Sequence, residues 1–215
     1  MEQSATNDNR ALFKNPTLWL GVVAAVLYSS WPLGYLLNPG VAHTALASQL
    51  EATRQPYNWL FIGCDIASGL ALLAAGAIQW RRAHGWLLRL SIASYAAFAA
   101  LVIVAALVPF DCDTPGATCV DPLHSPLIII HGLASILSPA GLLISIALLL
   151  RRLLRGPASL KVRLLPLAVI ISWGLLGLVA YDRYHHSGEN LVQYGFISIC
   201  SLSVLVAVTL IGVAA

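Results

Sequence analysis

The residues best suited to chemistry gather between positions 109 and 131, where three carboxylates, two cysteines and two histidines lie in one short stretch. Aspartate and histidine serve as zinc ligands and as general acids and bases, so this set is typical of a hydrolytic or ligand-binding site. Cys112 and Cys119 lie close enough in sequence for a disulfide in an oxidising compartment, with two free thiols as the alternative. Long apolar runs flank the stretch, so the surrounding helices determine where it lies.

The composition predicts a membrane protein built of helices. Of the 215 residues, 59% are hydrophobic and only 10% are charged, and the mean hydropathy is +0.81, which leaves too little polar surface for a soluble globule. A helix of about 20 residues crosses the hydrocarbon core of a bilayer. Six apolar runs reach that length: about 17–37, 58–80, 86–110, 126–150, 164–182 and 192–213. We therefore expect an all-α bundle of six transmembrane helices over residues 17–215, after a cytoplasmic tail at residues 1–16.

The distribution of charge predicts the orientation. Ten of the twelve Lys and Arg residues lie before the first span or in the loops after the second and fourth spans. The positive-inside rule then places both termini in the cytoplasm of a bacterium, with the protein in its inner membrane. The stretch 109–131 faces outward in this arrangement. Because the positive charges are divided by side of the membrane rather than gathered on one helix face, we expect no nucleic-acid partner.

Helix geometry predicts a layer of polar side chains inside the membrane. At about 1.5 Å per residue from the outer end of each span, four side chains lie about 8–10 Å deep: Ser30, Asp65, His131 and Ser198. A carboxylate in the membrane costs on the order of 2.5–3.5 kcal/mol, so Asp65 should face the bundle interior and have a partner. His131 is the partner we expect.

These four groups and Ser135 should line an outward-facing cavity, with Asp111 and His124 at its mouth. The predicted ligand-binding residues are Ser30, Asp65, Asp111, His124, His131, Ser135 and Ser198. Such a cavity would bind a membrane lipid or a small amphiphile. A non-catalytic accessory subunit that binds a partner membrane protein is an alternative, and a transporter or proton relay is another.

A further alternative for the function is a hydrolase that cleaves a lipid ester or amide. In one form, Asp111, His124 and His131 hold a metal such as zinc, whose bound water attacks the substrate. In a metal-free form, His131 is the general base, Asp65 orients it, and the hydroxyl of Ser68 or Ser30 is the nucleophile.

Two resemblances bear on these alternatives. The chain resembles an uncharacterised family of six-span prokaryotic membrane proteins, classed as a domain of unknown function, in these motifs: Trp59-Leu60-Phe61, Asp65 with Ser68 and Gly69, Pro109-Phe110-Asp111, and His124 with His131. That resemblance implies a six-helix bundle and no particular activity. By residue type, Ser68, Asp65 and His131 are similar to the site of the alkaline ceramidases and adiponectin receptors, which implies zinc and hydrolysis. The chain departs from that superfamily in having six predicted spans instead of seven and no His-x-x-x-His pair in the last span.

Overall fold

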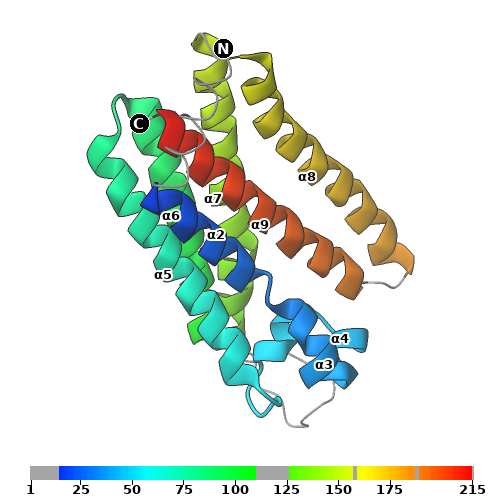
Figure 1. The fold of residues 1–215 in the computed structure, drawn as a ribbon. Coiled ribbons are helices and arrows are strands. Elements are labelled where there is room, and N and C mark those ends of the chain that lie inside the picture. The colour runs from blue at the N-terminus through cyan, green and yellow to red at the C-terminus, as the bar shows by residue number, and fades with distance from the viewer. Residues whose placement is uncertain (1–14, 110–125, 157–158, 187–188, 215) are drawn as a thin grey trace, which may run out of the picture.

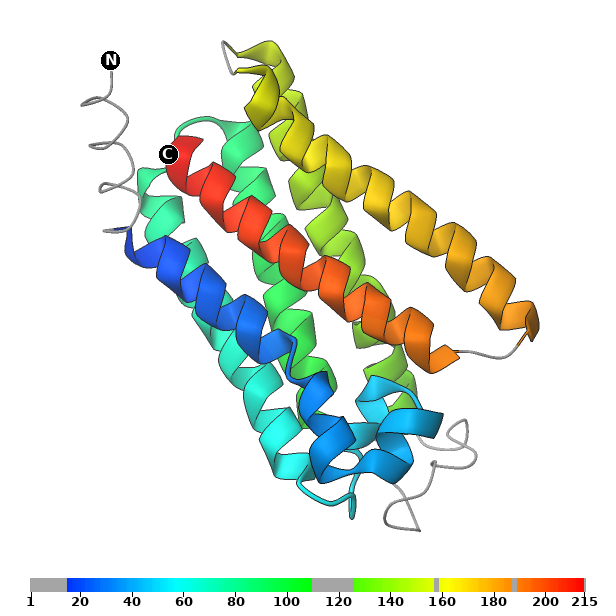
Figure 2. The ribbon, with the colours of Figure 1, turned by 45° about the vertical axis from the view of Figure 1, so that its right-hand side comes forward.

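The computed structural model describes residues 15–109, 126–156, 159–186 and 189–214, and contains no β-strand in those ranges. Figures 1 and 2 show long helices packed side by side, with neighbours in the chain running in opposite directions. They are α2 (Pro16–Tyr28), α5 (Asn58–Arg82), α6 (Trp86–Leu107), α7 (Pro126–Arg155), α8 (Leu160–His186) and α9 (Glu189–Ala214). The predicted all-α fold is confirmed.

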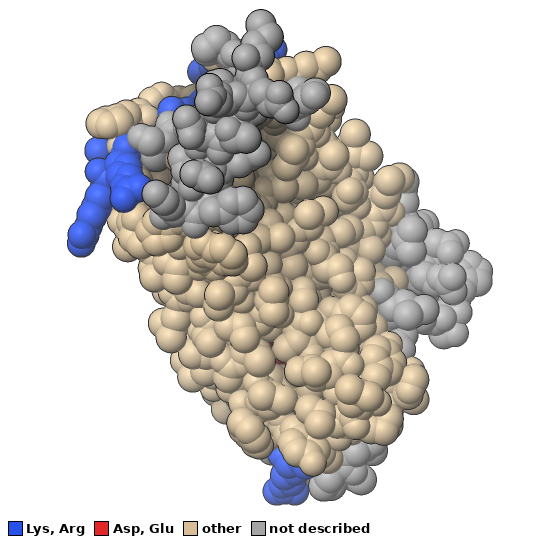
Figure 3. All heavy atoms as spheres, in the orientation of Figure 1, with Lys and Arg blue, Asp and Glu red and all other residues tan. Residues whose placement is uncertain are grey.

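Five stretches of the described chain are long and apolar enough to cross a membrane: Pro16–Leu37, Asn58–Arg82, Trp86–Leu107, Pro126–Arg155 and Val192–Gly212. The remaining predicted span falls on α8, whose described apolar part, Val162–Gly177, is shorter. On the face drawn in Figure 3, Lys and Arg lie at the two ends of the molecule, and the described surface between them is almost entirely uncharged. These features identify a multi-pass membrane protein.

The first predicted span, 17–37, is interrupted. Its main helix ends at Tyr28, and the chain continues through a 3-10 helix, η1 (Trp31–Leu33), into the short helix α3 (Gly34–Leu37). Pro32 has no N–H to donate to the carbonyl of Tyr28, so the helix cannot continue unchanged through this point.

Residues 31–57, which we call the cap, fold over one end of the bundle and include α3 and α4 (Pro39–Thr44), which are labelled in Figure 1. A second 3-10 helix in the cap, η2 (Ala47–Glu51), contributes the buried side chain of Leu50. Tyr194 of α9 contacts the cap from the side of the bundle. Its hydroxyl donates to the carbonyl of Ala42 at 2.7 Å, and its ring stacks on Trp31 with centroids 4.3 Å apart. The cap is therefore packed against the helices.

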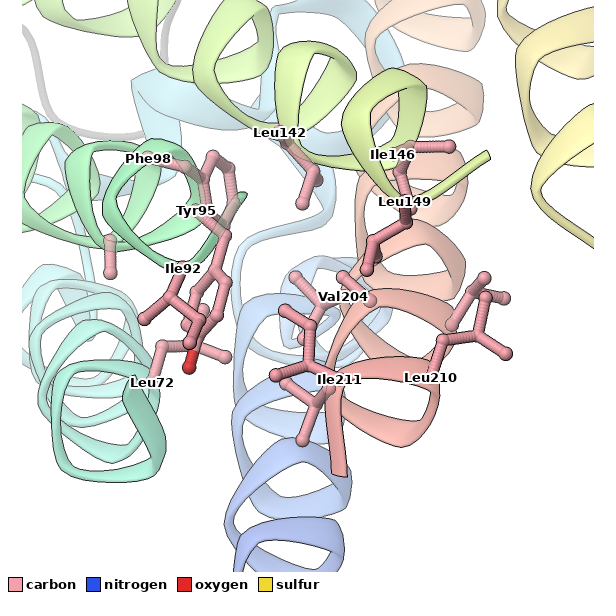
Figure 4. Close-up of a cluster of buried hydrophobic side chains, with 14 of the residues drawn as sticks. Leu72, Ile92, Tyr95, Phe98, Leu142, Ile146, Leu149, Val204, Leu210 and Ile211 are labelled. Atoms are coloured by element: carbon pink, nitrogen blue, oxygen red, sulfur yellow. The ribbon is translucent and has the colours of Figure 1, made fainter. Parts of the chain in front are cut away.

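The main core joins α5, α6, α7 and α9, as Figure 4 shows. Its labelled side chains are Leu72, Ile92, Tyr95, Phe98, Leu142, Ile146, Leu149, Val204, Leu210 and Ile211. Glycines allow α6 to approach its neighbours closely. A Cβ on Gly69 would lie 2.8 Å from the carbonyl oxygen of Ala99, and one on Gly141 would lie 2.7 Å from that of Ser94. This close packing fixes the height and rotation of α6 and α7, which carry part of the site.

Candidate functional site

A cavity of about 620 Å³ lies at the cap end of the bundle. Its walls come from α2, α5, α6, α7, α9 and the cap. Most of the lining is apolar, and the polar side chains in it are Ser30, Ser48, Asp65, His131, Ser135, Ser138 and Gln193. Ile136 of α7 also lines the cavity and is 71% exposed, so the cavity reaches the side of the bundle next to this residue. Four of the predicted ligand-binding residues thus come together here.

Asp65 on α5 is hydrogen-bonded to a second carboxyl group. The partner is Glu51, the last residue of η2 in the cap. Two carboxyl groups can share a hydrogen bond only when one of them carries the proton. Glu51 is only 8% exposed, and this burial raises its pKa from 4.5 to about 7 although the hydrogen bond to Asp65 acts in the opposite direction. The pair therefore holds a proton under conditions in which exposed carboxyl groups have lost theirs.

His131 is held by the end of α6. It is 2% exposed, and its Nδ1 lies 2.9 Å from the carbonyl oxygen of Ala105 and 3.0 Å from that of Val108. The last carbonyls of a helix have no partner within the helix, which makes them available to a side chain. Because a carbonyl only accepts, Nδ1 is the protonated nitrogen, and Nε2 of the neutral ring then carries the lone pair.

The partners that the structure gives Asp65 and His131 differ from the predicted pairing of these two residues. Asp65 is hydrogen-bonded to Glu51, and His131 is hydrogen-bonded to the α6 backbone. Both side chains line the same cavity.

The part of α7 that lines the cavity includes a proline. Ser135 and Ser138 line the cavity beside His131, and so does Pro139. Pro139 cannot donate to the carbonyl of Ser135, and the hydroxyl of Ser138 lies 3.4 Å from that carbonyl oxygen and donates to it instead. Ser138 therefore stabilises the helix at the proline.

Of the predicted site residues that the structure describes, two do not line the cavity. Ser68 is buried, and its hydroxyl donates to the carbonyl of Ala24 on α2 at 2.8 Å. Ser198 is exposed, and its hydroxyl donates to the carbonyl of Tyr194 at 2.9 Å, within its own helix. Both hydroxyls therefore bond to helix backbone, and Ser68, one of the two predicted nucleophiles, does not line this cavity, whereas Ser30, the other, does.

The predicted zinc site and disulfide depend on a segment that the structure leaves out. Asp111, His124, Cys112 and Cys119 all lie outside the described residues. Within the described ranges, no three His, Cys, Asp or Glu side chains are close enough to hold a metal ion. Zinc and the disulfide therefore stay predictions.

Glu51 is the site residue that the sequence analysis did not find. It lies outside the predicted spans, where a carboxylate is expected to be solvated. The sequence held only an indirect signal for Glu51. Asp65 needed a partner inside the membrane, and a second carboxyl group that retains its proton can be that partner.

The pKa of Glu51 makes stability depend on pH. A carboxyl group whose pKa is higher in the folded state contributes to the free energy of unfolding. The contribution is complete at pH values below the ordinary pKa of the group, and it is lost as the pH rises through about 7. We expect the melting temperature of the detergent-purified protein to fall by a few degrees between pH 5 and pH 8. Glu51→Gln, which cannot ionise, should show a smaller fall. An equal fall in the variant would rule out Glu51 as the cause.

The structure is that of a polytopic α-helical membrane protein: several of its helices are long and apolar enough to cross a membrane, and they enclose a cavity with a few polar side chains. The chain belongs to the family described as "Protein of unknown function (DUF998)", whose model matches residues 22–213. No curated protein and no solved structure matches the sequence. The predicted resemblance to an uncharacterised family is therefore confirmed, and the likeness to the alkaline ceramidases stays a prediction.

Proposed function

We propose that this protein binds a membrane lipid or a small amphiphile in the cavity, with the polar head group near Asp65, His131 and Ser30. The observation that carries the proposal is the combination of an apolar lining, a small group of polar side chains and a wall residue, Ile136, exposed on the side of the bundle. An amphiphile could enter from the bilayer past Ile136 and leave its apolar tail on that side.

The size and chemistry of the cavity support this function. Ligand pockets typically have volumes of about 300–1,000 Å³ and are lined mostly by apolar side chains, with a few polar groups that orient the ligand. The volume of about 620 Å³ falls in this range. A hydrolase that uses Ser68 as its nucleophile has less support, because the hydroxyl of Ser68 donates to the backbone of α2.

We also propose that the chain spans the inner membrane six times, with both termini in the cytoplasm and the cavity toward the outside. Arg82 and Arg152 belong to the helix ends opposite the cap, where the positive-inside rule expects the cytoplasm. A cysteine replacing exposed Thr44 of the cap should react in intact cells with a maleimide that cannot cross membranes. A cysteine replacing Arg82 should react only after permeabilisation, with both tested in a background without the four native cysteines. The reverse pattern would overturn the orientation.

Binding can be tested by filling the cavity. Ser135→Phe adds a ring to the lining, whereas Leu133→Phe, on the same helix, changes a side chain that is 53% exposed and does not belong to the described lining. Lipid extracted from the purified Ser135→Phe protein, measured by mass spectrometry, should fall several-fold relative to wild type, and the Leu133→Phe protein should retain the wild-type amount.

The two variants must melt within a few degrees of each other for the comparison to report on the cavity. If Ser135→Phe unfolds, the smaller change Ser135→Leu takes its place. Wild-type lipid content in a folded cavity-filling variant, or no bound amphiphile in the wild type, would overturn the proposed function.

A further inference from the structure

The cavity combines a carboxyl group with aromatic rings. Asp65 lines it from α5, and four aromatic side chains lie around the same space: Tyr28, Trp31, Phe61 and Phe196. No lysine or arginine of the described chain is part of the lining. The charge at this site is therefore supplied by acids, and the apolar surface includes the faces or edges of several rings.

A second acid lies directly behind the first. Glu51 does not itself belong to the described lining, but its carboxyl group is hydrogen-bonded to that of Asp65. Burying two carboxyl groups together is unfavourable unless protons or a positive charge compensate them. A proton shared within the pair compensates in part, and a cation in the cavity would compensate further.

The aromatic side chains suit the same kind of ligand. Aromatic faces attract ammonium groups, and quaternary ammonium ligands are commonly held by several rings together. Trp31 is fixed in place by stacking on Tyr194, and Tyr28 packs edge-on against Phe98 with ring centroids 5.5 Å apart. The rings are thus positioned by the protein before any ligand arrives.

We propose that the amphiphile carries an ammonium head group, which the cavity holds between the carboxyl group of Asp65 and the aromatic rings of Tyr28 and Trp31. This inference rests on the proposed function and adds the ligand class. The Asp65–Glu51 pair with one proton carries one negative charge, which an anionic head group would meet as a like charge and an uncharged head group would leave without compensation. The ammonium group can belong either to a lipid head group, as in phosphatidylethanolamine, or to a free alkylamine.

The test uses three amphiphiles with the same dodecyl tail and different heads: trimethylammonium, hydroxyl and sulfonate. Protein in maltoside micelles is incubated with each probe below its micellar concentration, and bound probe is counted by native mass spectrometry. We expect the wild type to bind the trimethylammonium probe at least tenfold more tightly than the alcohol, and the sulfonate least. A parallel arm with phosphatidylethanolamine distinguishes the sources: binding of both supports a lipid, and binding of the alkylammonium alone supports a free amine.

Two variants locate the preference. The double variant Glu51→Gln with Asp65→Asn keeps the size of both side chains and removes the negative charge of the pair, so the preference for the cation should fall to about twofold or less. Trp31→Leu removes a ring and should weaken binding of the cation more than that of the alcohol. Leu133→Phe, outside the described lining, should retain the full preference.

The outcomes separate this inference from the proposed function. Equal binding of all three heads by the wild type, or an undiminished preference in the folded double variant Glu51→Gln with Asp65→Asn, overturns the ammonium assignment and leaves the cavity as a binding site. Binding of none of the probes overturns both.

Discussion

A single methyl group added at position 141 is expected to destabilise the protein by about 1–3 kcal/mol. In Gly141→Ala, the new Cβ would lie 2.7 Å from the carbonyl oxygen of Ser94 and 3.2 Å from the backbone nitrogen of Phe98. These are backbone atoms of α6, so no side-chain rotation can relieve the contact. The helices α6 and α7 must separate, and the core residues between them lose packing.

The matched control is on the same helix. A Cβ at Gly132 meets no atom within 4 Å, so Gly132→Ala should be neutral or stabilise the helix by about 0.5–1 kcal/mol. Thermal unfolding in detergent can be followed with a thiol-reactive dye, in a background where buried Cys200 is the only cysteine. If the two variants melt at the same temperature, α6 and α7 are not packed as closely as the structure has them.

Much of the fold can be predicted from the sequence because the bilayer imposes a length on apolar helices. The predicted spans 58–80 and 86–110 correspond to Asn58–Arg82 and Trp86–Leu107, with shifts of a few residues at the ends. The break after Tyr28 follows from Pro32, which has no N–H to donate to the carbonyl of Tyr28. The path of the cap beyond the break is harder to predict, because it depends on tertiary contacts with Tyr194.

The sequence could predict how far along each helix the site residues lie, but not to which side of the helix their side chains point. Helix rise placed Ser30, Asp65 and His131 at one level, and all three line the cavity. The same argument placed Ser198 there, yet its side chain is exposed and bonds within α9, because depth along a helix says nothing about rotation around its axis. Glu51 escaped prediction for a different reason: it lies in the cap, where no helical period indicates which side chains are buried.

The second large effect is expected from a buried hydrogen-bond chain between three helices. The hydroxyl of Tyr95 on α6 donates to Oε1 of Gln79 on α5 at 2.6 Å, and Nε2 of Gln79 donates to the carbonyl of Val208 on α9 at 2.9 Å. Tyr95 and Gln79 are each 1% exposed, and the Tyr95 ring belongs to the core drawn in Figure 4. A polar atom that loses its partner here cannot turn to water.

Gln79→Leu removes both bonds and leaves the Tyr95 hydroxyl buried without an acceptor, which should destabilise the protein by about 2–3 kcal/mol. Tyr95→Phe leaves Oε1 of Gln79 without this donor and should cost about 1–2 kcal/mol. In the double variant neither group of the pair remains, so its loss should be smaller than the sum of the single losses by on the order of 1 kcal/mol.

The double-mutant cycle is measured by the same dye-detected unfolding, with Ser94→Ala as a control on α6. The Ser94 hydroxyl donates to the carbonyl of Leu90 in its own helix, so its removal should change stability by less than about 0.5 kcal/mol. Strictly additive losses would mean that Gln79 and Tyr95 do not depend on each other. Because this pair lies near the end of α5 opposite the cap, whereas Asp65 lies near its start, ligand content should be unchanged in a folded Tyr95→Phe variant. That result would show that the two ends of α5 have separate roles, one in stability and one in binding.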